Sequence, residues 1–341
     1  MKKRGVCRME NFSVRTDLAL ESALIAEQEH GGKLDGIVST ERQRDNTIVT
    51  TVKINEDGER ITGKREGLYV TVESTDLRGT DSSRHASISR IVAEEIRTFI
   101  DSAGISKDAS CLVAGLGNDL VTPDSLGPRV TDRLIVTNHL FKLHPEHVQK
   151  GYRPVSAISP GVMGMTGIET GDILLGLIER EKPDFLIVVD ALASRSIERL
   201  NATVQMTDSG IQPGAGIGNR RKEISRRTAG IPVIAIGIPT VIDAATVTRD
   251  AVEFVMKHLE EKSGRVDDNW KRAFLGNIGM LSEEEKRQLI HEVLSPAGLN
   301  MIVTPKEADS FIHGAAAVIS SALNEALHNR PPEETRSFFA G

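Results

Sequence analysis

The sequence predicts an α/β protein with three layers, in which helices cover both faces of a mostly parallel, mixed sheet. Three short, continuous apolar runs at 111–117, 185–192 and 231–237 have the composition of buried strands. Apolar strands that alternate with helices are typical of a parallel sheet buried on both faces. Helical patterns lie between and after these runs, at about 125–138, 170–181, 248–262, 283–295 and 306–328.

The N-terminal third of the chain has a different pattern. Its first 16 residues are polar and lack a clean period, and a helix is predicted from Asp17 to about Gly31, with Asp17 or the preceding threonine as the N-cap. Two β-rich runs, 47–54 and 68–73, are separated by a polar stretch that contains glycines and predict a long hairpin. Residues 86–103 form an amphipathic helical pattern.

These patterns predict an N-terminal tail, a helix-and-hairpin region, an α/β core and a C-terminal tail. The charged segment at about 263–300 interrupts the alternation of the core, so we expect a solvated helical insertion there. The sequence leaves open whether the helix-and-hairpin region is a separate domain or packs on the core. The predicted boundaries are 1–17, 18–105, 106–330 and 331–341.

Composition narrows the classes of function. The chain has 341 residues, of which 39% are hydrophobic and 26% charged, as in globular proteins. The formal charge of −6, with one Trp and 4% aromatic residues, argues against direct binding of nucleic acid. Cys7 and Cys111 are too few for a disulfide framework. We expect a cytoplasmic protein without a membrane segment, because there is no signal-peptide pattern or long apolar run.

Two aspartates follow apolar runs, where open α/β sheets form their sites. Asp190 closes the second run and Asp124 follows a proline after the first. If the two carboxylates converge they share a proton, so one activates water while the other protonates or polarises a substrate. The alternatives are that Asp190 caps a turn or pairs with Arg195, and that Asp124 caps a helix beginning at Ser125.

Several glycine-rich patterns are weaker signals. Asp208-Ser-Gly matches the short signature of pepsin-like proteases, but in α/β rather than all-β surroundings, so Asp208 is at most a secondary site residue. Gly115-Leu-Gly117 after a strand is typical of a dinucleotide loop, but Leu120 replaces the third glycine. The loop that contains Gly214 and Gly216 is flexible or binds anions, and its backbone N–H groups are candidates for stabilising an oxyanion.

Polar clusters provide two further candidates. His144-Pro-Glu-His147 has the wrong spacing for His-Glu-x-x-His, so we interpret it as solvated surface and predict no metal site and no cofactor. A local basic cluster is either a solvated face or a surface that attracts an acidic partner. Its members are Arg220, Arg221, Lys222, Arg226 and Arg227.

Three long motifs, at 115–129, 188–193 and 207–216, resemble the germination proteases of endospore-forming bacteria. The resemblance implies an endopeptidase that degrades small acid-soluble spore proteins early in germination. It also implies a phosphorylase/hydrolase-like fold related to hydrogenase maturation proteases, in which a Glu, an Asp and a His hold the client's nickel. Asp124 and Asp190 match the two acids, as the essential carboxylates of an atypical aspartic protease. The stretch from Asp208 to Asn219 has no His, which argues against nickel.

The family's substrates are cut in a segment like Thr-Glu-(Phe/Ile)-Ala-Ser-Glu, after the first Glu. Thr16-Asp-Leu-Ala-Leu-Glu21 repeats that pattern of hydroxyl, acid, apolar residue, alanine, variable residue and Glu. The resemblance therefore implies a zymogen that cuts itself between Asp17 and Leu18 and releases a propeptide, residues 1–17. The alternative is that Thr16 and Asp17 only cap a helix. The acids of the motif imply basic groups in the cleft, with Arg220 and Arg221 among the candidates.

The function predicted from this reading is an endopeptidase of the spore core (cytoplasmic), made as a self-processing zymogen and, by resemblance, a homotetramer. Its substrates would be small acid-soluble spore proteins, and coupled carboxylates predict that mild acid promotes self-cleavage. Two alternatives stay open: a metal-assisted peptidase of the hydrogenase-maturation type, and a non-catalytic binder of small spore proteins.

Overall fold

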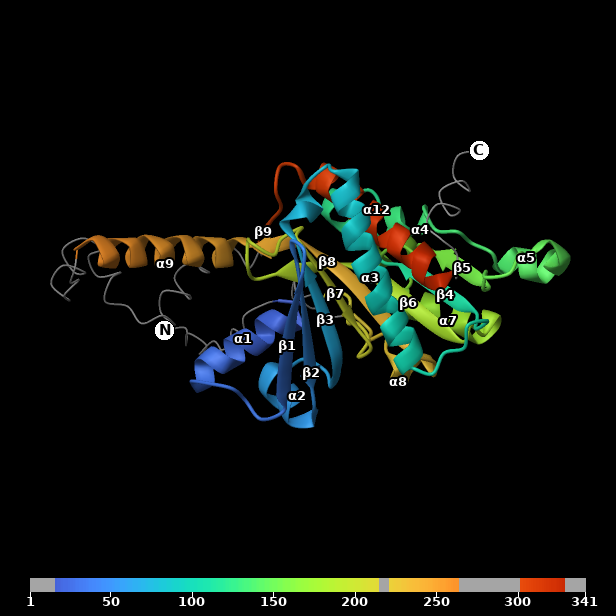
Figure 1. Ribbon diagram of the computed structural model, residues 1–341, viewed down its shortest axis with the longest axis horizontal. Helices are drawn as coiled ribbons and strands as arrows, with labels where there is room; N and C mark the ends of the chain where they lie inside the picture. Colours follow the sequence, from blue (N-terminus) through green and yellow to red (C-terminus); the bar gives the residue numbers. More distant parts are fainter. Residues whose placement is uncertain (1–15, 215–220, 264–300, 329–341) are drawn as a thin grey trace, which may run out of the picture.

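The computed structural model describes residues 16–214, 221–263 and 301–328, and its centre is one nine-stranded sheet (Figure 1). The strands follow the order β1-β2-β3-β7-β8-β6-β4-β5, and β9 pairs with β8. Their bounds are β1 Ile37–Arg44, β2 Thr47–Ile54, β3 Gly67–Glu73, β4 Cys111–Gly115, β5 Val155–Ile158, β6 Phe185–Ser194, β7 Thr203–Thr207, β8 Val233–Asp243 and β9 Ile302–Val303.

The sheet is mixed, and the predicted α/β class is confirmed. Strands β8, β6, β4 and β5 run parallel, so the three predicted apolar runs do form a parallel core. The other described pairings, which join β1, β2, β3, β7, β8 and β9, are antiparallel. The expectation of a mostly parallel sheet is therefore right for β8, β6, β4 and β5. It is wrong for β1, β2, β3 and β7, which join the sheet through antiparallel pairs.

The N-terminal strands form a meander rather than one long hairpin. β2 and β3 pair antiparallel as predicted, but a helix, α2, lies between them. The side chain of Asn55 starts that helix by accepting hydrogen bonds of 3.0 Å from the N–H groups of Asp57 and Gly58. The tight hairpin joins β1 to β2 through Asp45, which has a φ of 52°. Since β3 pairs with β7, this meander continues into the central sheet.

The helices partly match their predicted ranges. α7 has the predicted bounds and α12 differs by one or two residues, whereas the predicted helix 125–138 contains only the short α4, and α5 begins at its last residue. The predicted helix 283–295 and most of the predicted insertion lie outside the described residues. The bounds are α1 Ala19–His30, α2 Glu56–Thr62, α3 Ser82–Ser102, α4 Leu126–Thr131, α5 Asn138–Leu143, α6 Met163–Thr166, α7 Thr170–Glu181, α8 Arg226–Ala229, α9 Ala244–Ser263 and α12 Ala308–Leu327, with 3-10 turns η1 Thr75–Arg78, η2 Thr122–Asp124 and η3 Pro145–His147.

Helices cover both faces of the sheet. α3, α4 and α12 pack together on one face, and α3 and α12 lie side by side there (Figure 1). On the other face, Leu174 and Ile178 of α7 pack against β4 and β6. Ala19 and Ala23 of α1 pack on the same face against Val52 and neighbouring residues of the meander. This opposite face therefore carries two separate apolar clusters, with a strip of sheet between them.

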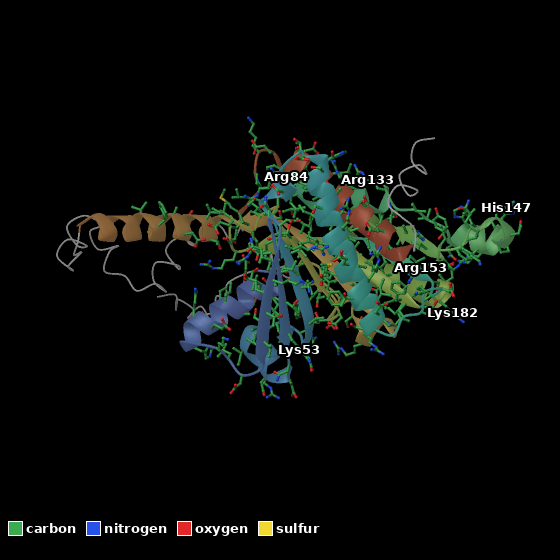
Figure 2. All side chains as sticks on the ribbon, in the orientation of Figure 1. Lys53, Arg84, Arg133, His147, Arg153 and Lys182 are labelled. Carbon is green, nitrogen blue, oxygen red and sulfur yellow. The ribbon has the colours of Figure 1, made fainter. Side chains whose placement is uncertain are left out.

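A buried arginine links the edge of the sheet to α12. Arg153 precedes β5, is 5% exposed, and donates a 2.8 Å hydrogen bond from Nε to the backbone oxygen of Leu327 (Figure 2). Its guanidinium lies 5.4 Å from the ring centre of Phe185, a distance typical of cation–π contacts. Burial lowers the pKa of Arg153. Among the described helices, none is long and apolar enough to cross a bilayer.

Candidate active site

Three neighbouring strands place Asp190, Gly237 and Gln205 in one row across the sheet. Gly237 of β8 is the register partner of Asp190 on β6 and of Gln205 on β7. Since strands lie about 4.8 Å apart, the Cα atoms of Asp190 and Gln205 are separated by roughly 10 Å. Asp190 shares its face with Val188, which packs against α7, so the row lies on the strip between the two apolar clusters.

This strip is the floor of a cleft with a volume of about 710 Å³. Asp190 borders the cleft, whereas Asp124 is not among its described lining residues. The lining is mostly polar and includes Thr16, Asp17, Lys64, Arg65, Tyr69, Asp190, Leu192, Gln205, Thr207, Ser209, Gly214 and Gly237.

Asp190 is buried, and its surroundings oppose the charged form of its carboxyl group. It is 6% exposed, and its Oδ1 accepts a 2.9 Å hydrogen bond from the N–H of Ala191. Burial raises the pKa of Asp190 well above its usual value, and the charges of Asp124 and Asp17 raise it further. The prediction that Asp190 closes its strand is wrong, because β6 continues to Ser194.

The alternative partner for Asp190 is also excluded. Arg195 pairs with Asp250 at 3.3 Å, so it does not neutralise Asp190. Asp190 is therefore a buried carboxyl whose charged form is opposed by two other carboxylates, which is the environment in which one acid of a group keeps its proton.

Asp124 is placed by a close approach of backbone segments. It ends η2, where burial raises the pKa of Asp124 to about 6 and the N–H of Asn118 opposes that shift. Gly117 has a φ of 115°, and a Cβ on it would lie 2.0 Å from the backbone oxygen of Asp124. Thr240 fixes η2 from β8 through a 2.6 Å hydrogen bond to Pro123.

Asp124 does not cap a helix. Ser125 holds the N-cap position of α4, and no side chain makes a capping hydrogen bond there. The expectation that Asp124 caps this helix is therefore wrong, and the Asp124 carboxylate stays available to act on Asp190.

Residues 16–18 lie along the end of β6 as an added extended segment. The N–H of Asp17 donates to the carbonyl of Ala193 at 2.9 Å, and the N–H of Ala193 donates to Oδ2 of Asp17 at 2.9 Å. Lys64 binds the carbonyl of Thr16 at 2.8 Å. Leu18 is fully buried and is the N-cap residue of α1, and no side chain makes a capping hydrogen bond there. The prediction that Thr16 or Asp17 caps this helix is therefore wrong.

Glu21 anchors the other end of the segment. This side chain is 3% exposed, and it accepts hydrogen bonds from the N–H groups of Arg195 at 2.7 Å and Ser196 at 2.9 Å. Arg199 lies 3.6 Å from its Oε1, and the hydroxyl of Thr16 donates to its Oε2. Glu21 is thus held by residues of the loop after β6, which are not members of the predicted basic cluster.

Removing this anchor should destabilise the fold. Glu21→Ala leaves the N–H groups of Arg195 and Ser196 without their acceptor and Arg199 with Glu73 alone, so we expect a loss of about 2–4 kcal/mol in unfolding free energy. The exposed Glu29→Ala on the same helix is the control and should change stability by less than about 0.5 kcal/mol. Denaturant unfolding measures both variants, and equal effects of the two substitutions would contradict the anchoring role of Glu21.

The other predicted site residues are more scattered. Asp208 is exposed and accepts a 2.8 Å hydrogen bond from the N–H of Leu68, which ties β7 to β3. Gly214 lines the cleft with a φ of 73°. Arg221 contacts the sulfur of Met163 at 3.8 Å and is not a lining residue. Gly216 and Arg220 lie outside the described residues.

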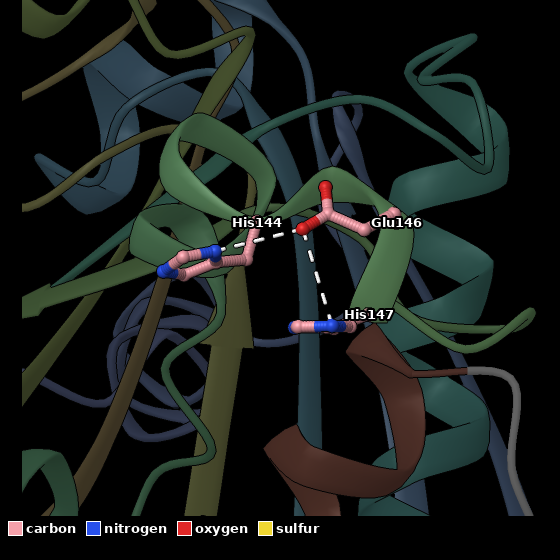
Figure 3. A group of neighbouring side chains, drawn as sticks. All are labelled: His144, Glu146 and His147. Carbon is pink, nitrogen blue, oxygen red and sulfur yellow. Dashed lines mark ion pairs between the residues drawn. The ribbon is translucent and has the colours of Figure 1, made fainter.

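His144, Glu146 and His147 cluster on the surface beside α5, at the β5 edge of the sheet (Figure 3). Nδ1 of His144 lies 3.6 Å and Nε2 of His147 lies 4.0 Å from Oε1 of Glu146. All three side chains are exposed, as predicted, and none lines the cleft. They therefore take no part in the chemistry of the Asp190 site.

The sequence reading missed Gln205, Gly237 and the contacts of Glu21. The alternation Val204-Gln205-Met206 is a strand signal that places Gln205 on the face opposite its two apolar neighbours. Only the register, however, brings Gln205 beside Gly237 and Asp190.

Comparisons with known proteins identify the family. A germination protease family model matches residues 15–272 and 261–340. Germination proteases of Bacillus licheniformis and Bacillus subtilis are 47% and 46% identical over 359 and 365 residues, which covers 97% and 99% of this chain and 98% and 99% of theirs. That of Bacillus mycoides is 49% identical over 350 residues, or 94% of this chain and 95% of its own.

Among solved structures, a [NiFe] hydrogenase maturation protease, HycI from Thermococcus kodakarensis, is 20% identical and covers 39% of this chain and 74% of its own, with a TM-score of 0.27. A likeness this weak does not bear on the site. The family model and the relatives together span almost the whole sequence. The chain belongs to the germination protease family.

Proposed function

We propose that this chain is an aspartic endopeptidase of spore germination that is made as a zymogen and cuts its own Asp17–Leu18 bond. The observation that carries the proposal is the position of Asp17: it lines the cleft that the buried carboxyl group of Asp190 also lines. In the mature form the same cleft would cut small acid-soluble spore proteins.

The proposed chemistry uses Asp124 and Asp190 as one pair that shares a proton. A water molecule adds to the carbonyl carbon of Asp17 and passes one proton to the ionised carboxylate, which leaves a tetrahedral intermediate with one hydroxyl and one oxyanion. The protonated carboxyl then gives its proton to the nitrogen of Leu18 as the C–N bond breaks. The products are a new carboxylate on Asp17 and a new amino group on Leu18. Asp190 is the more deeply buried of the two, and burial raises its pKa, which supports Asp190 as the resting holder of the proton.

The contacts of residues 16–21 support a substrate motif of the same pattern. Thr16 and Glu21 bind each other, Asp17 is held by Ala193, and Leu18 fills a buried site. A spore protein with hydroxyl, acid, apolar residue and a later Glu at these spacings could make the same contacts. The resemblance also implies a homotetramer, which analytical ultracentrifugation tests directly.

The pH dependence follows from the paired carboxylates. The reaction needs one proton on the pair, so the rate should rise as the pH falls from alkaline values, when the pair gains its first proton. It should fall again below about pH 6, when the second carboxylate, Asp124, is protonated. First-order rates of self-cleavage across this range measure the profile. A rate that does not change from alkaline pH to below pH 6 would contradict the shared proton.

The direct test is N-terminal sequencing of the purified full chain after incubation at mildly acidic pH. We expect a single new N-terminus at Leu18, and a cut at another bond would overturn the assignment. Incubation with a chelator separates the mechanisms, because loss of cleavage would favour the metal-assisted alternative. Prolonged incubation with acid-soluble spore proteins that yields no fragments would favour the alternative that the chain binds these proteins without cleaving them.

A further inference from the structure

We infer that Gln205 is a further catalytic residue, whose side-chain amide holds and polarises the carbonyl of the bond to be cut. The inference rests on the proposed cleavage between Asp17 and Leu18. It concerns the group that stabilises the oxyanion, for which the sequence offered only the loop of Gly214 and Gly216.

The side chain of Gln205 forms hydrogen bonds to the backbone on both sides of the Asp17–Leu18 bond. Its Nε2 donates a 3.1 Å hydrogen bond to the carbonyl oxygen of Asp17, and its Oε1 accepts a 2.6 Å hydrogen bond from the N–H of Ala19. The second contact fixes the orientation of the amide, because an N–H group requires an oxygen acceptor. Nε2 is therefore directed at the carbonyl oxygen of the bond that would be cut.

The location of Gln205 suits this role. Gln205 of β7 and Asp190 of β6 stand on opposite sides of Gly237 in the sheet, and both line the cleft. The side chain of Leu192 lies over Gly237, where a Cβ would come within 2.5 Å of its Cγ. Gln205 therefore holds the carbonyl oxygen from the β7 side of the cleft, and Asp190 borders the same cleft from β6.

Charge develops on that oxygen when water adds to the carbonyl carbon. Gln205 is 6% exposed, and a hydrogen bond to a developing oxyanion is stronger in a site from which water is excluded. The donor is already oriented by Ala19, so it needs no reorganisation during the reaction. Because both contacts are to backbone atoms, Gln205 acts on the peptide group itself and leaves side-chain selection to other residues.

The test is Gln205→Met in the full chain, which keeps the side-chain volume and removes the donor. We expect the rate of self-cleavage to fall about 10²- to 10³-fold at every pH, because an amide does not titrate. Gln205→Glu is the second variant: it keeps an oxygen to accept from Ala19 and, when ionised, has no donor, so it should also be slow at neutral pH. Gln43→Met, on the exposed edge strand β1, is the matched control and should cleave at the normal rate.

Thermal unfolding and the Asp190→Asn variant separate the possible outcomes. A normal rate in both Gln205 variants, with Asp190→Asn inactive, would overturn the role of Gln205 and leave the proposed function intact. Continued cleavage by Asp190→Asn would instead contradict the proposed function. If both Gln205 variants lose rate only in proportion to a lower unfolding temperature, their role is structural and the inference fails.

Discussion

Asp190→Asn is expected to fold and to lose about 10⁴-fold in the rate of self-cleavage, as triad enzymes do when a buried aspartate becomes asparagine. An amide neither gives nor accepts the shared proton, while its shape preserves the contact with Ala191. Asp124→Asn should show a loss of similar size. Mass spectrometry of the N-terminus over time measures the rates, and Asp57→Asn on the exposed helix α2 is the control.

Asp190→Asn should become more stable relative to the parent chain as the pH rises. The pKa of folded Asp190 lies above its ordinary value of 3.8, so the native state keeps a proton that the unfolded chain releases. The stability of the parent chain therefore falls as the pH rises from that value to the folded pKa. Asparagine does not titrate, so the difference in unfolding midpoint between Asp190→Asn and the parent chain should grow over this range. Near-normal cleavage, or a midpoint difference independent of pH, would refute the assignment.

Gly117→Ala should also slow self-cleavage, by about 10²-fold. A Cβ at Gly117 would meet the backbone oxygen of Asp124 at 2.0 Å, and the φ of 115° is unfavourable for alanine. The loop must shift, and an aspartate displaced by about 1 Å can cost about 10²-fold in rate. The rate of self-cleavage and the denaturation midpoint should be measured together.

Gly104→Ala is the matched control for this substitution. Gly104 has a φ of 70°, but a Cβ there meets nothing within 4 Å. It therefore shares the strain of a positive φ without the collision, and its rate should be normal while its stability falls modestly. Equal losses of activity in the two alanine variants would show that the close approach of Gly117 to Asp124 is unimportant.

The fold could be predicted where burial left a pattern in the chain. The runs that became β4, β6 and β8 are apolar because both faces of the parallel core are covered, and α7 matches its predicted range. β1 was missed because it is an edge strand in which only Ile37 is buried, so it has no alternation to detect. α2 was missed because its glycine and charges resemble those of a loop.

The site could be predicted only in part for a related reason. Asp124 and Asp190 stand out because each carboxylate adjoins an apolar run, and the charge of Asp124 raises the pKa of Asp190. Glu21 binds backbone N–H groups about 175 positions further along the chain. Backbone groups leave no side-chain pattern in the sequence from which these contacts could be predicted. Gln205 gains its position from the pairing of β7 with β8, which depends on register rather than on residue type.

The occupied cleft has a kinetic consequence. Under the proposed function, residues 16–21 compete with outside substrates for the cleft, and because they belong to the same chain they rebind with an effective concentration in about the millimolar range whatever the protein concentration. A freely diffusing protein with the same motif must outcompete this tethered ligand. Dilution will not release it, and turnover of outside substrates will therefore lag until the first turn of α1 detaches from the loop after β6.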